Sequence, residues 1–459
     1  MSAGARTRRV AQFARDVRWA DLPAAVQAQA VRCLLDLCGS AVAGSLTPVA
    51  RIAAAYARAA HGPGGATIIG ADSGSTPVGA ALANGFAASA LDIDDGYRPV
   101  KGHPGAVVLP AVLAAAEQAR ASGSEFLTAL VVAYEVAMRA GRILHPLYGF
   151  YHGTGAWGPV GAAAGAARLL RLTPDETWHA LGIAEFHAAM TPEMRSVDHP
   201  SMLKDGIGWG AMVGLASVGL AAAGFTGIPS LFDAGPEGAA LCESLGRDYL
   251  VLDLYFKPYP CCRWAQPAVE GALAAARALG VRGDEIARVT VYTFEAATHL
   301  RAVAPRTTEE AQFSLPWPVA CALLGGTVGP ADVLGAALED AARRRLAARV
   351  AIVEEPELSR QFPARALARV EVETADGRRA RSGVVAARGD ADAPPADAEL
   401  REKFHRLADP VLGTSGARSL AAAVEDLPGA ESLDRLLERL RVPAPAPSGG
   451  APLATRRLP

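Results

Sequence analysis

Residues 91–105 read Leu91-Asp92-Ile93-Asp94-Asp95-Gly96-Tyr97-Arg98-Pro99-Val100-Lys101-Gly102-His103-Pro104-Gly105. They join two apolar segments with helical spacing, at 79–90 and 106–118. Three carboxylates within four residues, followed by cations and a histidine, are costly beside a hydrophobic core unless each charge has a partner. An acidic triplet is most often a solvated loop between helices. Here glycine and proline fix the backbone around His103, so we expect the loop to open into a concave site.

Length and composition limit what kind of protein this chain is. With 459 residues it exceeds what a single core usually supports, which predicts two domains. A formal net charge of -2 gives no basic excess for binding nucleic acid or an anionic membrane. The six cysteines are scattered without a CxxC pair, so we expect reduced thiols and a cytoplasmic location.

Neither an export signal nor a membrane span is expected. Arg8-Arg9 is followed by further charged residues instead of an apolar segment. The longest apolar run, 211–225, has about fifteen residues, fewer than the roughly 20 that cross a bilayer. We therefore expect it to form a buried helix.

The apolar spacing changes along the chain. Up to residue 255 it is helical, with almost no strand signal. Residues 287–294 then alternate with a period of two, 349–353 is a further expected strand, and 368–385 has the pattern of a β-hairpin around Asp376-Gly377. Further helices are expected at 309–324, 330–347, 397–407, 416–425 and 432–441.

These patterns predict a mainly α protein with a smaller α+β unit. The expected boundaries place a helical domain in 1–255, the α+β unit in 256–395 and a return to helix in 396–442. Residues 443–459 are rich in proline and alanine, and we expect a disordered tail there.

Four other segments place polar groups next to glycine or proline at the end of an apolar helix. They contain His152 in Tyr151-His152-Gly153-Thr154, Lys204 at the start of the apolar run, the cationic segment 257–263, and Gln312-Phe313-Ser314. A lone histidine is more often structural than catalytic, and a lysine at a helix start is often solvated. Lysine is nevertheless rarely buried without a partner and opposes the helix dipole at an N-terminus, which favours an anion near Lys204.

Six segments resemble, in order, the signature blocks of the MmgE/PrpD family. They are Asp92-Ile93-Asp94-Asp95 with His103-Pro104-Gly105, Tyr151-His152-Gly153-Thr154, Gly224-Phe225-Thr226-Gly227, Lys257-Pro258-Tyr259-Pro260-Cys261, Ala311-Gln312-Phe313-Ser314, and Asp409-Pro410-Val411-Leu412-Gly413. Each block is short, but together they extend the resemblance over nearly the whole chain. The family contains 2-methylcitrate dehydratase, cis-aconitate decarboxylase and iminodisuccinate epimerase.

The resemblance implies a large helical domain built from both chain ends and a smaller inserted α+β lid, with the active site in the cleft between them. It also implies a homodimer that needs no metal and no organic cofactor. By family motif, the positions that line the site are Asp92, His103, His152, Lys204 and Lys257.

A small carboxylate substrate suits these residue types. Lysine, arginine and protonated histidine offset its negative charge, and the same cations stabilise a carbanion next to a carboxylate. We expect His103, oriented by Asp92, to be the general acid/base, Lys204 and Lys257 to bind carboxylates, and His152 to be a second acid/base. Further substrate-binding residues are expected to be Asp95, Tyr97, Arg263, Gln266, Trp317, His187 and Ser314.

The chain also departs from the family pattern. Gly96 stands where citrate-like members tend to have threonine, Gln266 where the family has a histidine, and Trp317 where it has an aromatic hydroxyl. Glu185 and His187 belong to a segment that adds charge. These departures predict a substrate other than 2-methylcitrate or cis-aconitate, and they leave open an inactive binding or scaffold protein.

Several reactions fit the same proton chemistry. Dehydration ranks first as the commonest named activity of the family, and decarboxylation, epimerisation and double-bond isomerisation remain open. Asp92-Ile93-Asp94-Asp95 also matches the DxDD acid motif of class II terpene cyclases, but 6% aromatic residues are few for a carbocation pocket. Cys261-Cys262 lacks the spacing of a common metal site.

Overall fold

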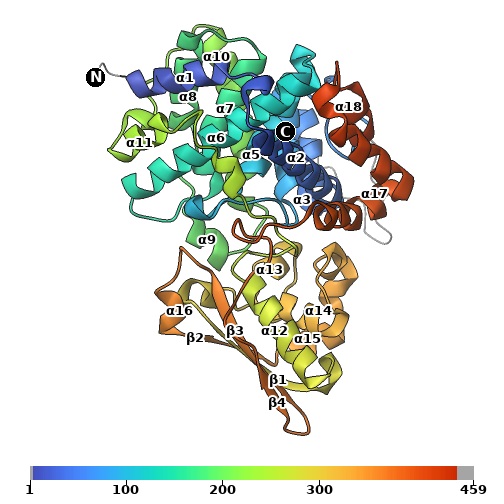
Figure 1. The fold of residues 1–459 in the computed structure, drawn as a ribbon. Coiled ribbons are helices and arrows are strands. Elements are labelled where there is room, and N and C mark those ends of the chain that lie inside the picture. Colours follow the sequence, from blue (N-terminus) through green and yellow to red (C-terminus); the bar gives the residue numbers. More distant parts are fainter. Residues whose placement is uncertain (1–3, 442–459) are drawn as a thin grey trace.

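The computed structural model describes residues 4–441, so the predicted tail at 443–459 lies outside the described residues. Figure 1 shows a helical body formed by the first half of the chain together with its last helices, and below it a smaller unit of helices and one sheet. We call the smaller unit the lid. The prediction of a mainly α fold with a small α+β portion is confirmed.

The helical body is built from both ends of the described chain. Its helices are α1 (Ala5–Asp16), α2 (Ala24–Gly44), α3 (Pro48–Ala60), α4 (Pro77–Ser89), α5 (Pro104–Ala119), α6 (Gly123–Leu147), α7 (Gly158–Leu169), α8 (Pro174–Phe186), α9 (Glu193–Asp198), α10 (Ile207–Ala222), α11 (Glu237–Glu243), α17 (Asp397–Glu425) and α18 (Asp434–Leu440). Proline or a Ser/Thr cap begins many of them, as at Thr76-Pro77, because proline tolerates the first helical turn. The C-terminal α17 packs along α2, which joins the two ends.

The lid contains α12 (Gln266–Leu279), β1 (Ile286–Thr293), α13 (Thr308–Gln312), α14 (Pro316–Gly325), α15 (Ala341–Ala347), β2 (Val350–Glu354), α16 (Pro356–Ser359), β3 (Leu367–Thr374), β4 (Arg379–Arg381) and β5 (Val385–Ala386). Its sheet has the order β2-β1-β3-β4, and β5 also pairs with β3. β1 and β2 are parallel, and β3 is antiparallel to both β1 and β4. In register, Val291 lies opposite Ile352 on one side and Val370 on the other, and α12 covers the sheet.

Four expected helices have different bounds. Pro316 divides the segment 309–324 into α13 and α14, because proline cannot continue a helix that is already under way. The segment 330–347 contains two short 3₁₀ turns before α15 begins at Ala341. The two helices expected at 397–407 and 416–425 are one element, α17, with a break at Gly413, where φ is 69°.

The loop at 91–105, which we call the acid loop, is anchored at the junction of the two units. Its Leu91 and Ile93 are buried in the apolar cluster of the lid, together with Leu407 of α17. Tyr97 and Val100 belong to the core of the helical body instead. Apolar residues therefore fasten both ends of the loop while its carboxylates face the interior between the units.

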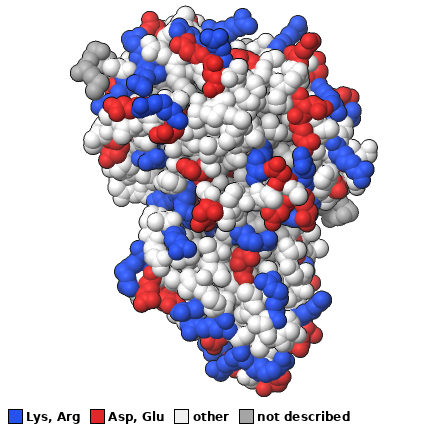
Figure 2. All heavy atoms as spheres, in the orientation of Figure 1, with Lys and Arg blue, Asp and Glu red and all other residues white. Residues whose placement is uncertain are grey.

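The apolar helix α10 lies inside the helical body. Together with the turn that begins at Lys204, this helix has 19 residues. Among residues 4–441 it is the one helix that is long and apolar enough to cross a membrane. The helices α2 and α3 reach that length and hydropathy only when counted as one span, and an 89° bend separates them. About two thirds of the helix that begins at Lys204 is buried, against α4, α5, α7 and α8. On the face drawn in Figure 2, acidic and basic side chains are interspersed.

Candidate active site

A small cavity of about 40 Å³ lies where the acid loop meets the lid. The helical body contributes residues of the acid loop, Tyr151, Glu193, Val197 and Asp205. The lid side contributes the segment from Cys262 to Trp264, together with Phe313, Phe362 and Pro363. Of the residues predicted for the site, Asp92, His103, Lys257 and Arg263 line this cavity.

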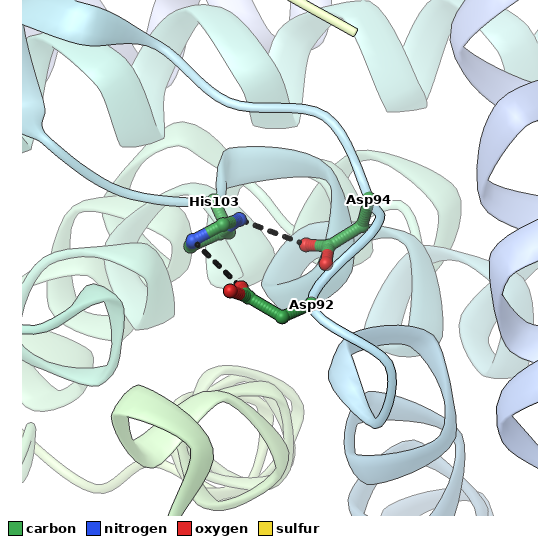
Figure 3. Close-up of side chains that lie close together, drawn as sticks. All are labelled: Asp92, Asp94 and His103. Carbon is green, nitrogen blue, oxygen red and sulfur yellow. Dashed lines mark ion pairs between the residues drawn. The ribbon is translucent and has the colours of Figure 1, made fainter. Parts of the chain in front are cut away.

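His103 lies at the centre of the acid loop, between carboxylates on both sides of its ring (Figure 3). It is the N-cap of α5, and its backbone N–H donates to Thr154 Oγ1 at 3.0 Å. Its Nδ1 lies 3.2 Å from Asp94 Oδ2 and 3.1 Å from the Asp95 carbonyl oxygen. Because both neighbours are acceptors, Nδ1 carries a hydrogen and donates.

The other ring nitrogen of His103 faces the cavity. Nε2 lies 3.6 Å from Asp92 Oδ1 and 3.8 Å from Asp205 Oδ2. Burial and the Lys257 ammonium both disfavour a charged imidazole, but Asp94 and Asp92 outweigh them, and the pKa of His103 is raised. The histidine is therefore held as an imidazolium more firmly than a free histidine would be.

Asp92 and Lys257 form a buried ion pair beside this histidine. Lys257 Nζ donates to Asp92 Oδ1 at 2.7 Å and to the Asp92 carbonyl at 3.0 Å. The φ of Asp92 is 51°, a conformation few non-glycine residues adopt. Asp92, Asp94 and His103 lie within 4.8 Å of one another, as metal ligands do, but the Lys257 ammonium already neutralises Asp92.

Behind the acid loop a second ion pair faces away from the cavity. Lys403 of α17 lies 2.5 Å from Asp36 of α2 and donates to the Ile93 carbonyl at 2.7 Å. Asp95, predicted to bind substrate, lies in this rear layer, where it accepts hydrogen bonds from the Tyr134 hydroxyl and the Gly105 N–H. Burial raises the pKa of Asp95 to about 7.

Lys204 and His152 are buried but do not line the cavity. Lys204 Nζ donates to Gln312 Oε1 at 2.6 Å and lies 5.5 Å from the ring centre of Phe313. The His152 ring packs on Phe150 at a centroid distance of 3.9 Å, and burial lowers its pKa. A second acid/base role for His152 therefore has no support from its position.

At the cavity mouth, two arginines share one carboxylate. Arg98 and Arg263 lie 2.7 and 2.8 Å from oxygens of Asp390, and the Arg263 guanidinium lies 4.6 Å from the ring centre of Tyr255. A Cβ at Gly96 would lie 2.2 Å from Tyr255, so the tyrosine ring occupies the space that a side chain at position 96 would take.

The other predicted substrate-binding residues lie away from the cavity. Gln266 donates to the carbonyls of Tyr259 and Cys261, and the Trp317 indole donates to the Asp332 carbonyl. The Ser314 hydroxyl donates to the Ala302 carbonyl. The backbone of Tyr97 pairs with Gly102, and His187 ends α8 with its ring nitrogen near the Ile183 carbonyl.

The sequence analysis missed several cavity residues, which are Arg98, Lys101, Tyr151, Glu193, Asp205, Tyr255 and Cys262. Five were within reach of the motifs, because they lie in or beside segments already singled out: Arg98, Lys101, Tyr151, Asp205 and Cys262. Nothing in the local sequence distinguishes Glu193 or Tyr255.

Comparison with known proteins gives matches over most of the chain. The MmgE/PrpD N-terminal domain matches residues 8–249 and the MmgE/PrpD C-terminal domain matches 259–428. Cis-aconitate decarboxylase-like protein oryM of Aspergillus oryzae is 26% identical, covering 94% of this chain and 96% of its own. Cis-aconitate decarboxylase of Homo sapiens is 28% identical over 90% of each chain. The Aspergillus terreus enzyme of the same name is 30% identical over 39% of this chain and 38% of its own.

Proposed function

This chain belongs to the MmgE/PrpD family, and from that premise we propose that it is a lyase that removes carbon dioxide from a small polycarboxylic acid. The relatives named as cis-aconitate decarboxylases support a decarboxylase or dehydratase type of enzyme. Because of these names we rank decarboxylation first and dehydration second, whereas the resemblance to the family alone led us to expect dehydration first. A homodimer and a cytoplasmic location remain predictions.

The charges of the cavity suit a substrate with several carboxylates. Arg98, Lys101, Lys257 and Arg263 line it together with His103. Within a partly dehydrated space these cations attract anions more strongly than they do in water. They also stabilise the negative charge that develops when a carboxylate leaves as carbon dioxide.

The position of His103 between Asp94 and Asp92 is the observation that carries the proposal, because these carboxylates raise its pKa and favour the imidazolium. Decarboxylation breaks a C–C bond and leaves its electron pair on the substrate, where a proton must replace the lost carbon dioxide. An imidazolium donates that proton from Nε2, the nitrogen on the cavity side. An epimerase or isomerase needs an unprotonated base to begin, which this environment of His103 opposes.

Dehydration is the second candidate. Asp92 lines the cavity and has one carboxylate oxygen without a hydrogen-bond partner among the described residues. That carboxylate could take a proton α to a substrate carboxylate while His103 protonates the departing hydroxyl.

The substrate is proposed to differ from that of the named relatives. Tyr255 fills the space above Gly96 and contacts Arg263, so the cavity wall there is aromatic. None of the three departures lines the cavity itself, but Gly96 leaves room for Tyr255, which does, and it therefore acts on substrate choice through that ring.

Proton NMR in D2O tests the function. Purified protein is incubated with aconitate-, citrate-, malate- and aspartate-like acids, and products are followed by their carbon-bound protons. We expect loss of carbon dioxide, with deuterium at the carbon that receives the new proton. H103A should lower turnover by about 10²- to 10⁴-fold, the usual contribution of a general acid.

The control is H405A, because His405 pairs with Asp409 on α17, away from the cavity. It should turn over like the wild type. Loss of water instead of carbon dioxide would establish the second candidate. A wild-type rate in H103A would contradict both candidate reactions. Fast turnover of cis-aconitate or 2-methylcitrate would contradict the proposal that the substrate differs from that of the named relatives.

A further inference from the structure

We propose that Glu193 and Asp205 share a single proton beside His103 and return it to that histidine after each turnover. This inference rests on the proposed function, because it names the source of the proton that each decarboxylation consumes. The pair has no counterpart among the residues predicted from the sequence motifs.

Glu193 reaches the cavity through a short backbone pairing. His152 forms a bridge with Pro192, and the Glu193 N–H donates to the Tyr151 carbonyl at 3.0 Å. The Tyr151-His152-Gly153 motif thus positions Glu193 through its backbone while the His152 ring points elsewhere. A Cβ at Gly153 would lie 2.4 Å from Glu193 Oε2, so glycine leaves room for the carboxyl group.

The environment of the Glu193 carboxyl group indicates an unused proton site. The side chain lines the cavity, yet the residue is only 2% exposed. Its Oε2 has no hydrogen-bond partner among the described residues. A buried carboxylate without partners is costly, whereas a neutral carboxyl group costs much less.

Asp205 reaches the same place on a strained turn. Lys204, Asp205 and Gly206 have φ values of 45°, 56° and 72°, and the first two are uncommon for residues with a side chain. Such strain persists where the surrounding structure imposes it, often at functional sites. Here the turn holds Asp205 Oδ2 3.8 Å from His103 Nε2.

Both carboxyl groups line the same cavity, and a Cβ at Gly153 would lie 2.4 Å from Glu193 Oε2 and 3.2 Å from the Asp205 carbonyl oxygen, so the two residues are neighbours. Neighbouring carboxyl groups in a buried site do not both ionise readily at neutral pH. Burial raises the pKa of Glu193 well above its ordinary value, the Asp205 and Asp92 carboxylates raise it further, and the Lys204 ammonium opposes them. Of the other titratable groups that line the cavity, Tyr151 and Tyr255 also have pKa values raised by burial. Cys262 likewise has a pKa raised by burial, Lys257 despite its burial has a pKa raised by Asp92, and burial lowers the pKa of Lys101. One proton therefore stays on the pair while His103 is charged.

The step balances without any added reactant. The substrate carbanion takes the proton from His103 Nε2, forming a C–H bond and leaving a neutral imidazole. The shared carboxyl proton then moves from Asp205 to Nε2, an O–H bond breaking as an N–H bond forms. A molecule of bulk water then gives a proton to the pair, an O–H bond breaking as the carboxyl O–H bond forms, and hydroxide is released to the solvent.

Infrared spectroscopy tests the shared proton without a substrate. Protonated carboxyl groups absorb apart from carboxylates, and the band shifts in D2O. The wild type minus E193Q difference at pH 7 should contain one such band. D205N should lose the same band, because without the Asp205 charge Glu193 ionises more readily. No difference band for E193Q would overturn the inference.

Kinetics test the relay. E193Q should lower kcat by about 100-fold with little change in KM, and acetic acid in the buffer should restore part of the loss, since it supplies the missing proton. A purely structural role would not respond to the acid. The control is E185Q, because Glu185 is a half-buried glutamate whose pKa is also raised by burial, but it accepts the Leu231 N–H outside the cavity. E185Q should keep the wild-type kcat.

The outcomes separate this inference from the proposed function. A wild-type kcat in E193Q would overturn the relay even if the protein is a decarboxylase. A band lost in both variants, in a protein that turns over none of the acids, would support the shared proton and overturn the proposed function.

Discussion

Two lysines hold adjacent carbonyls of the acid loop, one from each side. In front, Lys257 pairs with Asp92 and donates to the Asp92 carbonyl. Behind, Lys403 pairs with Asp36 and donates to the Ile93 carbonyl. All four charged side chains are buried, so the two pairs use the same chemistry.

Their protonation differs. Burial disfavours the Lys257 ammonium, but Asp92, Tyr255 and Asp94 together outweigh it and raise its pKa. In the rear pair burial prevails, lowering the pKa of Lys403 and raising that of Asp36. The surroundings of Lys257 therefore favour its charged form, whereas burial disfavours the charged forms of both Lys403 and Asp36. The front pair, Asp92 and Lys257, lines the cavity. The rear pair fixes the position of the acid loop through the hydrogen bond from Lys403 to the Ile93 carbonyl.

The largest effect is expected from breaking the front pair. K257M leaves Asp92 as a buried charge without its partner, which costs about 3–5 kcal/mol of unfolding free energy. It also removes a cation from the cavity, so turnover should fall by about 100-fold or more. Urea unfolding and steady-state kinetics measure the two losses.

Breaking the rear pair should cost less. In K403M the raised pKa of Asp36 lets that carboxyl take up a proton, and we expect a loss of about 1–3 kcal/mol. The loss should shrink as the pH falls, and K403M combined with Asp36→Leu should recover part of it. Equal costs for K257M and K403M in parallel urea titrations would show that the two pairs do not differ.

The sequence indicated the front of the site better than the rear. Asp92, His103 and Lys257 stand beside glycine and proline in short motifs, and their polarity beside apolar helices is visible locally. Lys403 and Asp36 lie 367 positions apart, 403 minus 36, on two helices whose relative register no local pattern specifies. Asp390 pairs with the cavity residues Arg98 and Arg263 from a segment whose sequence indicates only a linker.

The sequence also did not reveal which side chains of a motif point into the cavity. The motif around His152 was noticed, but its backbone bridge to Pro192 turns the ring away from the cavity and brings Glu193 in instead. The mainly α fold with one small sheet could be predicted, because helical and alternating periodicities depend only on neighbouring residues. The break in 330–347 could not, since that segment keeps an apolar pattern without being one helix.

The smallest effect, and the one that sharpens the comparison, is the pH response of the rear layer. Asp95 has a pKa of about 7 in the folded protein, above its ordinary value, so between about pH 4 and 7 the folded state binds more protons than the unfolded state. Unfolding free energy should therefore fall as pH rises through that window, by about 1 kcal/mol per pH unit for this group, and level off above it. D95N should lose this slope. Y134F should extend it above pH 7, because the Tyr134 hydroxyl favours the charged carboxylate. Urea titrations from pH 5 to 8 measure how the unfolding free energy changes with pH in each variant. An unchanged slope in D95N would show that a charged Asp95 costs no stability, so that the rear layer accepts a charged carboxylate as readily as the front pair does.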